Sequence, residues 1–341
     1  MTDMALFYPQ GHQAHYERGH PERPERVETI RRELENAGLW DATVKTQPRQ
    51  IPETVLHAVH TPAYLQTLEI ACRQGAHLDA DTYTTPASWQ LAFDNAGGAV
   101  ELARQVWSGE VQSGFALTRP PGHHATPTRG MGFCLLNNIA LAAEYLLQQE
   151  DAERIAIVDL DLHHGNGTQD VFWKRDDVFY LSTHQSPFYP GSGYIRETGA
   201  GQGENHTANF PLPPGSGDQA FETVMDSLIL PLLDRYQAQI VLVSVGFDPH
   251  WRDPLGSLLM SSQKYYELIL DLKGWAERNC AGRLALFLEG GYDLQAGASC
   301  GLASVAALSG TAFEDQLGAA RHQESNQWQE MARAAQEIWR L

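Results

Sequence analysis

The chain has 341 residues, of which 43% are hydrophobic, enough to fill the core of one large α/β domain or two smaller ones. Its formal charge at pH 7 is 24 − 42 = −18, which argues against a nucleic-acid-binding surface, because such surfaces need clustered lysine and arginine. An acidic exterior is typical of many soluble proteins, and it would also favour cationic substrates.

The four cysteines are widely scattered and form no CxxC pair, so we expect reduced thiols in a cytoplasmic protein rather than a disulfide framework. The N-terminus lacks the basic-then-apolar form of a signal peptide, and no apolar run has membrane-spanning length. We therefore expect neither a membrane nor a nucleic acid among its partners. No feature of the sequence indicates an oligomeric state.

Strand and helix patterns alternate along the chain. Short apolar runs typical of buried strands lie at 6–8, 114–117, 155–158, 178–181, 240–245 and 284–288, and amphipathic helix patterns lie at 23–36, 88–107, 135–149, 219–236 and 263–278. This alternation predicts βαβ units with a parallel sheet. We expect a single α/β domain over residues 1–341, with three α/β/α layers and a central, mostly parallel sheet.

Two long connections follow predicted strands. Residues 119–132 include three prolines, three glycines and two histidines, and residues 185–217 are rich in glycine, proline and aromatic side chains. Long loops inside a compact domain are usually functional or disordered. Both should lie at the carboxyl edge of the sheet, where open α/β sheets bind their ligands.

The first of these loops contains a pair of adjacent histidines, His123 and His124, in the run Arg-Pro-Pro-Gly-His-His. A histidine pair on a rigid Pro-Gly turn suits either two metal ligands or two acid–base groups. Isolated histidines are mostly structural, so the interpretation depends on the groups that the other strands bring to this edge.

The strand at 155–158 runs directly into Asp159, Asp161 and His163. Side chains alternate along a strand, so these three should leave the backbone on one side. Two carboxylates and an imidazole are expensive to desolvate together without a cation. A hydrogen-bonded polar cluster is the alternative, but a metal site is favoured.

The strand at 240–245 delivers a further carboxylate, Asp248. Alone, an aspartate before proline is more often a turn former or a helix cap. Together with Asp161 and His163 it would make three protein ligands and leave a fourth position open, as in catalytic zinc sites. Two carboxylates form a hard ligand set, so iron(II), cobalt and manganese are alternatives to zinc. With three ligands assigned, acid–base roles are preferred for the histidine pair.

The last predicted strand ends at Glu289-Gly290-Gly291-Tyr292. Two glycines suit a tight loop that points the phenol of Tyr292 into a pocket, where it could stabilise a developing oxyanion. A tyrosine packed over a glycine turn is the alternative, and it would be preferred if the other motifs were missing.

Taken together and in this order, the motifs resemble those of the zinc-dependent histone deacetylase family, which has the arginase–deacetylase fold. The resemblance runs from about residue 19 to 308 and includes the segments 19–26, 119–124, 132–134, 159–169, 246–248 and 289–292. Asn166 and the run Asp-Pro-Leu-Gly at 253–256 are similar to the class II branch and its bacterial relatives.

The resemblance implies a role for each residue. Asp161, His163 and Asp248 would bind a catalytic Zn²⁺, and His124 would be the general base and then the acid. His123, paired with Asp159, would stay charged, and Tyr292 would donate a hydrogen bond to the oxyanion. The family also holds a structural K⁺, whose ligands here would be Asp159, Asp161, His163, Ser182 and Thr183.

The resemblance also implies an acyl-lysine channel, and a substrate that is an acyl-lysine peptide or an acetylated polyamine. Gly132, Phe133 and Tyr189 would line this channel, with Tyr189 in place of the more usual phenylalanine. Leu255 stands where a polyamine-selective branch has a glutamate, which favours removal of acetyl or other short acyl groups from lysine. Acetylpolyamine amidohydrolase activity is the alternative, and a metal-binding scaffold without turnover is a weaker one because every catalytic position is filled.

Overall fold

The computed structural model describes residues 4–341, and its centre is an eight-stranded sheet in which every neighbouring pair of strands is parallel. The strands are β1 (Met4–Phe7), β2 (Val44–Lys45), β3 (Ser113–Ala116), β4 (Ile155–Asp159), β5 (Val178–Gln185), β6 (Thr207–Leu212), β7 (Ile240–Val245) and β8 (Leu284–Leu288). Their order is β2-β1-β3-β8-β7-β4-β5-β6. Four strands, β3, β8, β7 and β4, therefore occupy the middle of the sheet.

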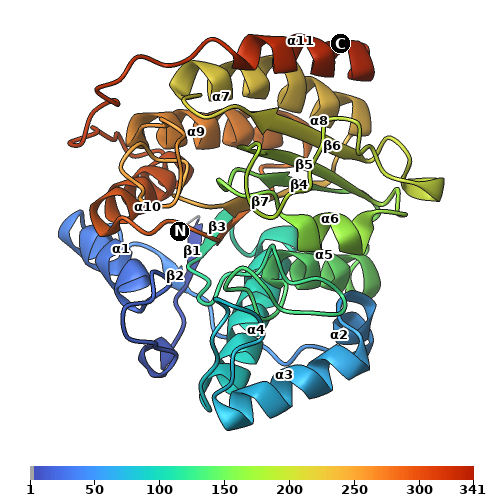
Figure 1. Cartoon of the computed structure of the whole chain (residues 1–341), viewed down its shortest axis with the longest axis vertical. Coiled ribbons are helices and arrows are strands. Elements are labelled where there is room, and N and C mark those ends of the chain that lie inside the picture. Colours follow the sequence, from blue (N-terminus) through green and yellow to red (C-terminus); the bar gives the residue numbers. More distant parts are fainter. Residues whose placement is uncertain (1–3) are drawn as a thin grey trace.

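Helices cover both faces of this sheet (Figure 1). They are α1 (Glu25–Asn36), α2 (Glu53–Val59), α3 (Pro62–Gln74), α4 (Ser88–Trp107), α5 (Asn138–Gln149), α6 (Asn166–Phe172), α7 (Asp218–Val224), α8 (Leu230–Tyr236), α9 (Ser262–Asn279), α10 (Leu294–Ser309) and α11 (Trp328–Trp339). One π-helical segment, Met225–Ile229, joins α7 to α8. None of the helices in residues 4–341 is long and apolar enough to cross a membrane.

Two separate hydrophobic cores show why the molecule has three layers. Alternate strand residues point to opposite faces of a sheet: in β4, Val158 packs in the core beneath α1, α7–α11, whereas Ile157 packs in the core beneath α2–α5. Because both faces are covered, the central strands are mostly apolar, and every residue of β7 and β8 is buried. The predicted three-layer α/β fold is confirmed.

The limits of some elements differ from the predicted ones. Helix α5 begins at Asn138 rather than at 135, because the side chain of Asn137 caps it by accepting a hydrogen bond from the amide of Ala140 (3.0 Å). The connection 185–217 is not a continuous loop, since it contains β6. Strand β2 and helices α2, α3, α6, α10 and α11 had no counterpart among the predicted elements.

Candidate active site

The four central strands end at the same level and bring their following residues to one place. Asp159, the last residue of β4, is in register with Ser244 of β7, and Ser244 is in register with Phe287 of β8. Asp161 and His163 follow β4, Asp248 follows β7, Tyr292 follows β8, and the histidine pair follows β3. The candidate site therefore lies at the carboxyl edge, as parallel α/β sheets require.

Asp161, His163 and Asp248 form a trio whose potential ligand atoms all lie within 4.8 Å of one another, with both carboxylates buried and the imidazole partly buried. His163 Nδ1 is 3.2 Å from Asp161 Oδ1 and 3.2 Å from Asp248 Oδ2. Strand β4 ends at Asp159, so Asp161 and His163 lie beyond the strand, and the alternation of side chains along a strand does not place them. Instead, the chain bends after the strand, and the amide of His163 donates to Asp161 Oδ1 (2.8 Å).

The trio has the properties of a metal site. Asp248 Oδ2 is buried, and among the described residues no donor makes a hydrogen bond to it. Burial and the nearby charge of Asp161 raise the pKa of Asp248 to about 7. A Cβ atom on Gly246 would lie 1.8 Å from Asp161 Oδ2, and one on Gly290 would lie 2.2 Å from Asp248 Oδ2. Any larger residue at these two positions would therefore clash with the carboxylates. A divalent cation fits this donor set.

His123 and His124 lie side by side, with ring centroids 4.1 Å apart, but they have different partners. His123 Nδ1 donates to Asp159 Oδ2 (3.1 Å), whereas His124 Nδ1 donates to the amide oxygen of Asn166 (2.8 Å). Burial alone would lower the pKa of His123, but the charges of Asp159 and Asp161 raise it to about 10. Burial and the charge of His123 hold the pKa of His124 well below its ordinary value. One imidazole is therefore charged and the other neutral.

Glu289 joins the loop that contains the histidine pair (residues 119–124, the histidine loop) to the end of β8. Its Oε2 accepts hydrogen bonds from the amides of Gly122 (2.6 Å) and His123 (3.0 Å), and its Oε1 accepts from Ser244 Oγ (3.1 Å). Burial raises the pKa of Glu289 to about 7. The sequence analysis assigned no role to this side chain, although its position before the two glycines could have indicated one.

Tyr292 lies at the same edge, in a buried position. Its amide donates to Asp253 Oδ2 (2.6 Å), its ring packs edge-on against Phe133 (centroids 5.7 Å apart), and the guanidinium carbon of Arg26 lies 4.9 Å from its ring centroid. Burial raises the pKa of Tyr292 well above its ordinary value, although Arg26 opposes this shift. The phenol therefore keeps its proton and can donate it in a hydrogen bond.

Aromatic side chains surround the histidines. Tyr189 is 40% exposed, and its ring centroid lies 5.2 Å from that of His124 and 6.0 Å from that of His163. Phe188, which the sequence analysis did not select, stacks on His163 with centroids 5.4 Å apart.

Gly132 and Leu255 were also predicted to contact the substrate. Gly132 has a positive φ of 55°, and a Cβ atom there would lie 2.5 Å from the ring of His124, so glycine is required. Leu255 is half-buried, and its amide donates to Asp253 Oδ1 (3.0 Å).

Ser182 and Thr183 lie on β5, next to the candidate metal ligands. Ser182 is in register with Asp159, and its hydroxyl hydrogen-bonds to His184 Nδ1 (2.9 Å). Thr183 Oγ1 is buried, and no described residue forms a hydrogen bond with it.

The family model of the histone deacetylase domain matches residues 20–308 of this chain. A probable deacetylase of Archaeoglobus fulgidus is 41% identical over 278 residues, which cover 81% of this chain and 77% of the relative. A histone deacetylase-like amidohydrolase of Pseudomonas aeruginosa is 36% identical over 297 residues, which cover 86% and 77% of the two chains.

A chloroplastic relative and a solved structure extend the similarity. Histone deacetylase 14, chloroplastic, of Arabidopsis thaliana is 40% identical over 324 residues, covering 89% of this chain and 75% of that protein. The crystal structure of the HDA15 HD domain superposes with a TM-score of 0.90 at 32% sequence identity, and the match covers 99% of this chain and 94% of that one. The fold is therefore shared along almost the whole chain.

Proposed function

The chain belongs to the histone deacetylase family, and from this premise we propose that it removes acetyl or other short acyl groups from the ε-amine of lysine. It is a hydrolytic enzyme that acts on an amide other than a peptide bond, as its deacetylase and amidohydrolase relatives indicate. One observation supports the proposal most: the trio, in which Asp248 Oδ2 is buried and accepts no hydrogen bond from the described residues, lies next to a histidine pair whose two members have different partners.

Asp161, His163 and Asp248 would hold one Zn²⁺. When bound, such an ion polarises a carbonyl group and makes a water molecule more acidic at neutral pH. Because two of the three ligands are carboxylates, iron(II), cobalt and manganese are the alternatives.

The residues around the trio would divide the proton transfers and the electrostatic stabilisation. His124 Nδ1 is occupied by Asn166, so Nε2 of the neutral ring has the lone pair that can take a proton from the attacking water and return it to the departing amine. His123, held by Asp159, would keep a positive charge beside the reaction. The hydroxyl of Tyr292 would donate to the carbonyl oxygen as negative charge develops there.

We further propose that a K⁺ ion binds behind the zinc, with ligands from Asp159, Asp161, His163, Ser182 and Thr183. The unpaired, buried hydroxyl of Thr183 supports this proposal. We also propose that residues 1–341 form one catalytic domain and that the protein is cytoplasmic. The free, buried state of all four cysteines is in keeping with that location.

Deacetylation of acetylpolyamines is the second candidate function. The charge of −18 would attract a polycation, and the relative from Pseudomonas aeruginosa is named an amidohydrolase. An apolar Leu255 offers no charge for a second amine, and this favours acyl-lysine.

A substrate panel tests the proposal. Purified protein, with its metal content measured, is assayed on acetyl-lysine peptides, longer acyl- and lactyl-lysine peptides, and N-acetylpolyamines. We expect about one metal ion per chain and the highest kcat/KM for an acyl-lysine peptide. Asp248→Ala should lose both metal and activity, whereas Asp226→Ala, an exposed carboxylate on the π-helical segment, should retain both.

Each unexpected result has a separate meaning. A higher kcat/KM for an N-acetylpolyamine would favour the second candidate function. Full turnover by metal-free Asp248→Ala protein would refute the metal assignment. No turnover of any amide by metal-loaded protein would leave the scaffold interpretation.

A further inference from the structure

We propose that Glu22, which is not one of the catalytic residues, is a positioning residue. Through Arg119 and Arg26 it would hold the histidine loop and the Tyr292 loop (residues 289–292) at a fixed spacing. The inference rests on the proposed function, because it concerns the spacing of the groups that would carry out the hydrolysis. The sequence analysis identified the segment 19–26 only as part of the family resemblance and gave its residues no role.

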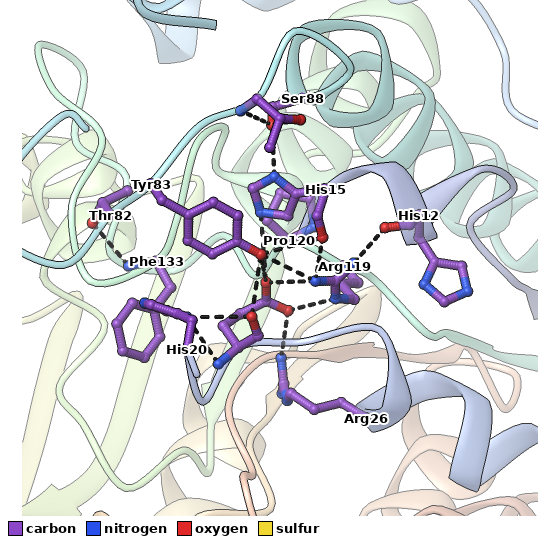
Figure 2. Close-up of polar contacts among 12 residues, drawn as sticks. His12, His15, His20, Arg26, Thr82, Tyr83, Ser88, Arg119, Pro120 and Phe133 are labelled. Carbon is purple, nitrogen blue, oxygen red and sulfur yellow. Dashed lines mark hydrogen bonds and ion pairs between the residues drawn. The ribbon is translucent and has the colours of Figure 1, made fainter. Parts of the chain in front are cut away.

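Glu22 is completely buried, and polar atoms of four other side chains face its carboxylate. Its Oε1 is 2.7 Å from Arg119 Nε and 3.3 Å from Arg26 Nη1, and its Oε2 is 3.1 Å from Arg119 Nη2 and 3.2 Å from the hydroxyl of Tyr83. His15 Nε2 is 3.5 Å away. Figure 2 shows the side chains of Arg26, Arg119, Tyr83 and His15 pointing toward one another from different segments of the chain.

Arg26 connects Glu22 to the Tyr292 loop. Its Nε donates to the carbonyl of Gly291 (2.7 Å), and its Nη2 donates to the carbonyl of Glu289. Its guanidinium also lies over the ring of Tyr292, 4.9 Å from the centroid. The side chain of Arg26 therefore contacts both the backbone that precedes Tyr292 and the ring of Tyr292.

Arg119 connects Glu22 to the histidine loop. It is the residue before Pro120-Pro121-Gly122, so little backbone freedom separates it from His123. Its guanidinium also donates to the carbonyls of His12 (2.6 Å) and His15 (2.6 Å), which anchors it to the N-terminal segment.

Glu289 closes the connection into a ring. Its carbonyl accepts from Arg26, and its carboxylate accepts from the amides of Gly122 and His123. The contacts thus run from Glu22 through Arg26 and Glu289 to the histidine loop, and back through Arg119. A shift of either loop would strain contacts in the other.

Charge explains why a carboxylate is needed at the centre. The buried guanidiniums of Arg26 and Arg119 both face Glu22, and neither forms an ion pair with another carboxylate of the described residues. Without Glu22, both charges would be buried without a counter-charge. Burial would raise the pKa of Glu22, but Arg119, His15 and Arg26 lower it to about 2. The carboxylate is therefore ionised at any pH at which the enzyme would work.

The alternative is that Glu22 only stabilises the fold, and a matched control separates the two. Glu144 on α5 is also a buried carboxylate, and it pairs with Arg175, which precedes β5 at the opposite edge of the sheet. Glu144→Gln should lower the thermal midpoint without changing kcat. Glu22→Gln, assayed at a temperature at which it is folded, should lower kcat by about 10- to 100-fold while KM changes by less than about threefold and metal content is unchanged.

Combination with a catalytic variant sharpens this measurement. In a Tyr292→Phe background, Glu22→Gln should lower kcat by a smaller factor than in wild type, because one of the two positioned groups is already missing. Equal factors in the two backgrounds, or a wild-type kcat in folded Glu22→Gln, would overturn the proposal. If Glu22→Gln does not fold, Arg26→Lys keeps the charge but cannot serve both carbonyls. It should lower kcat in the same way, and an unchanged kcat would overturn the proposal.

Hydrogen–deuterium exchange tests the ring without any substrate. Amides in peptides covering 118–125 and 289–293 should exchange faster in Glu22→Gln or Arg26→Lys than in wild type, and should be unchanged in Glu144→Gln. Faster exchange in only one loop, or in neither, would overturn the proposal. If exchange changes as expected while no amide is hydrolysed by wild type, the proposed function fails and the positioning ring stands.

Discussion

Two adjacent residues of the same type, His123 and His124, have pKa values shifted in opposite directions because their surroundings differ. A carboxylate faces Nδ1 of His123, and a neutral amide faces Nδ1 of His124. The charge of His123 in turn helps to keep the second ring neutral. In the proposed mechanism one dipeptide would supply both a base and a fixed positive charge, because nearby carboxylates raise the pKa of His123 while burial and the charge of His123 lower the pKa of His124.

This difference predicts unequal effects of mutation. His124→Ala should lower kcat by about 10²- to 10⁴-fold with metal still bound, since a general acid–base group typically contributes that much. His123→Ala should cost less, because it removes a charge and leaves the proton transfers intact. Steady-state kinetics of metal-loaded variants on the best amide substrate measure both. A larger loss for His123→Ala would reverse the two assignments.

At the residue scale, side chains that follow predicted strands could be assigned to the site from the sequence, whereas contacts that depend on the course of a loop could not. Asp161, His163 and Asp248 could be predicted as neighbours because parallel strands end at a common edge. Phe188, which stacks on His163, lies in a loop whose course no periodicity reveals. Asn166 was noticed only as a family marker, and its bond to His124 follows from the close passage of two separate segments.

At the scale of elements, the strands that surround the site were the predictable part and several helices were not. β8 is a continuous apolar run and β7 is apolar except for Ser244, which is typical of strands buried on both faces. β6 includes Asn209 and Pro211, residues that are depleted in strands, and it lies at the edge of the sheet where proline is tolerated. Helix α6 contains Gly167, which hides its helical pattern.

Close packing between elements gives a prediction for Gly290, which follows β8. A Cβ atom there would lie 2.2 Å from Asp248 Oδ2 and 2.8 Å from Asp161 Oδ2. Gly290→Ala should displace these carboxylates and lower both metal content and kcat, the latter by about 10²-fold. Gly297→Ala in α10 is the control. No heavy atom lies within 4 Å of its added Cβ, and helix propensity favours alanine by up to about 1 kcal/mol. Normal metal content in Gly290→Ala would show that the trio can move without loss.

At the scale of the whole molecule, the fold buries several histidines in a neutral form. The pKa of His12, His15, His60, His184 and His250 is lowered in each case to about 4, with burial as the first cause. His60 shows how the neutral form is held: its Nδ1 donates to the carbonyl of Thr126 (3.0 Å), and its Nε2 accepts from the amide of Asn137 (2.9 Å). The sequence shows that these histidines are present, but burial depends on the assembled layers and could not be predicted from it.

These histidines should make the protein sensitive to mild acid. Between pH 6.5 and 4 an unfolded chain would bind protons that the native one does not, so the free energy of unfolding should fall as pH is lowered through this range. The contribution of His60 alone would be about 3 kcal/mol by pH 4, a large part of a typical total of about 5–15 kcal/mol. Urea unfolding across pH 4–7 measures the slope. Replacement of His60 by glutamine, which does not titrate, should lower stability at pH 7 but reduce the slope by about 1.4 kcal/mol per pH unit, the value of one proton. An equal slope in the two proteins would mean that His60 is protonated in the native state, which its bond from the amide of Asn137 opposes.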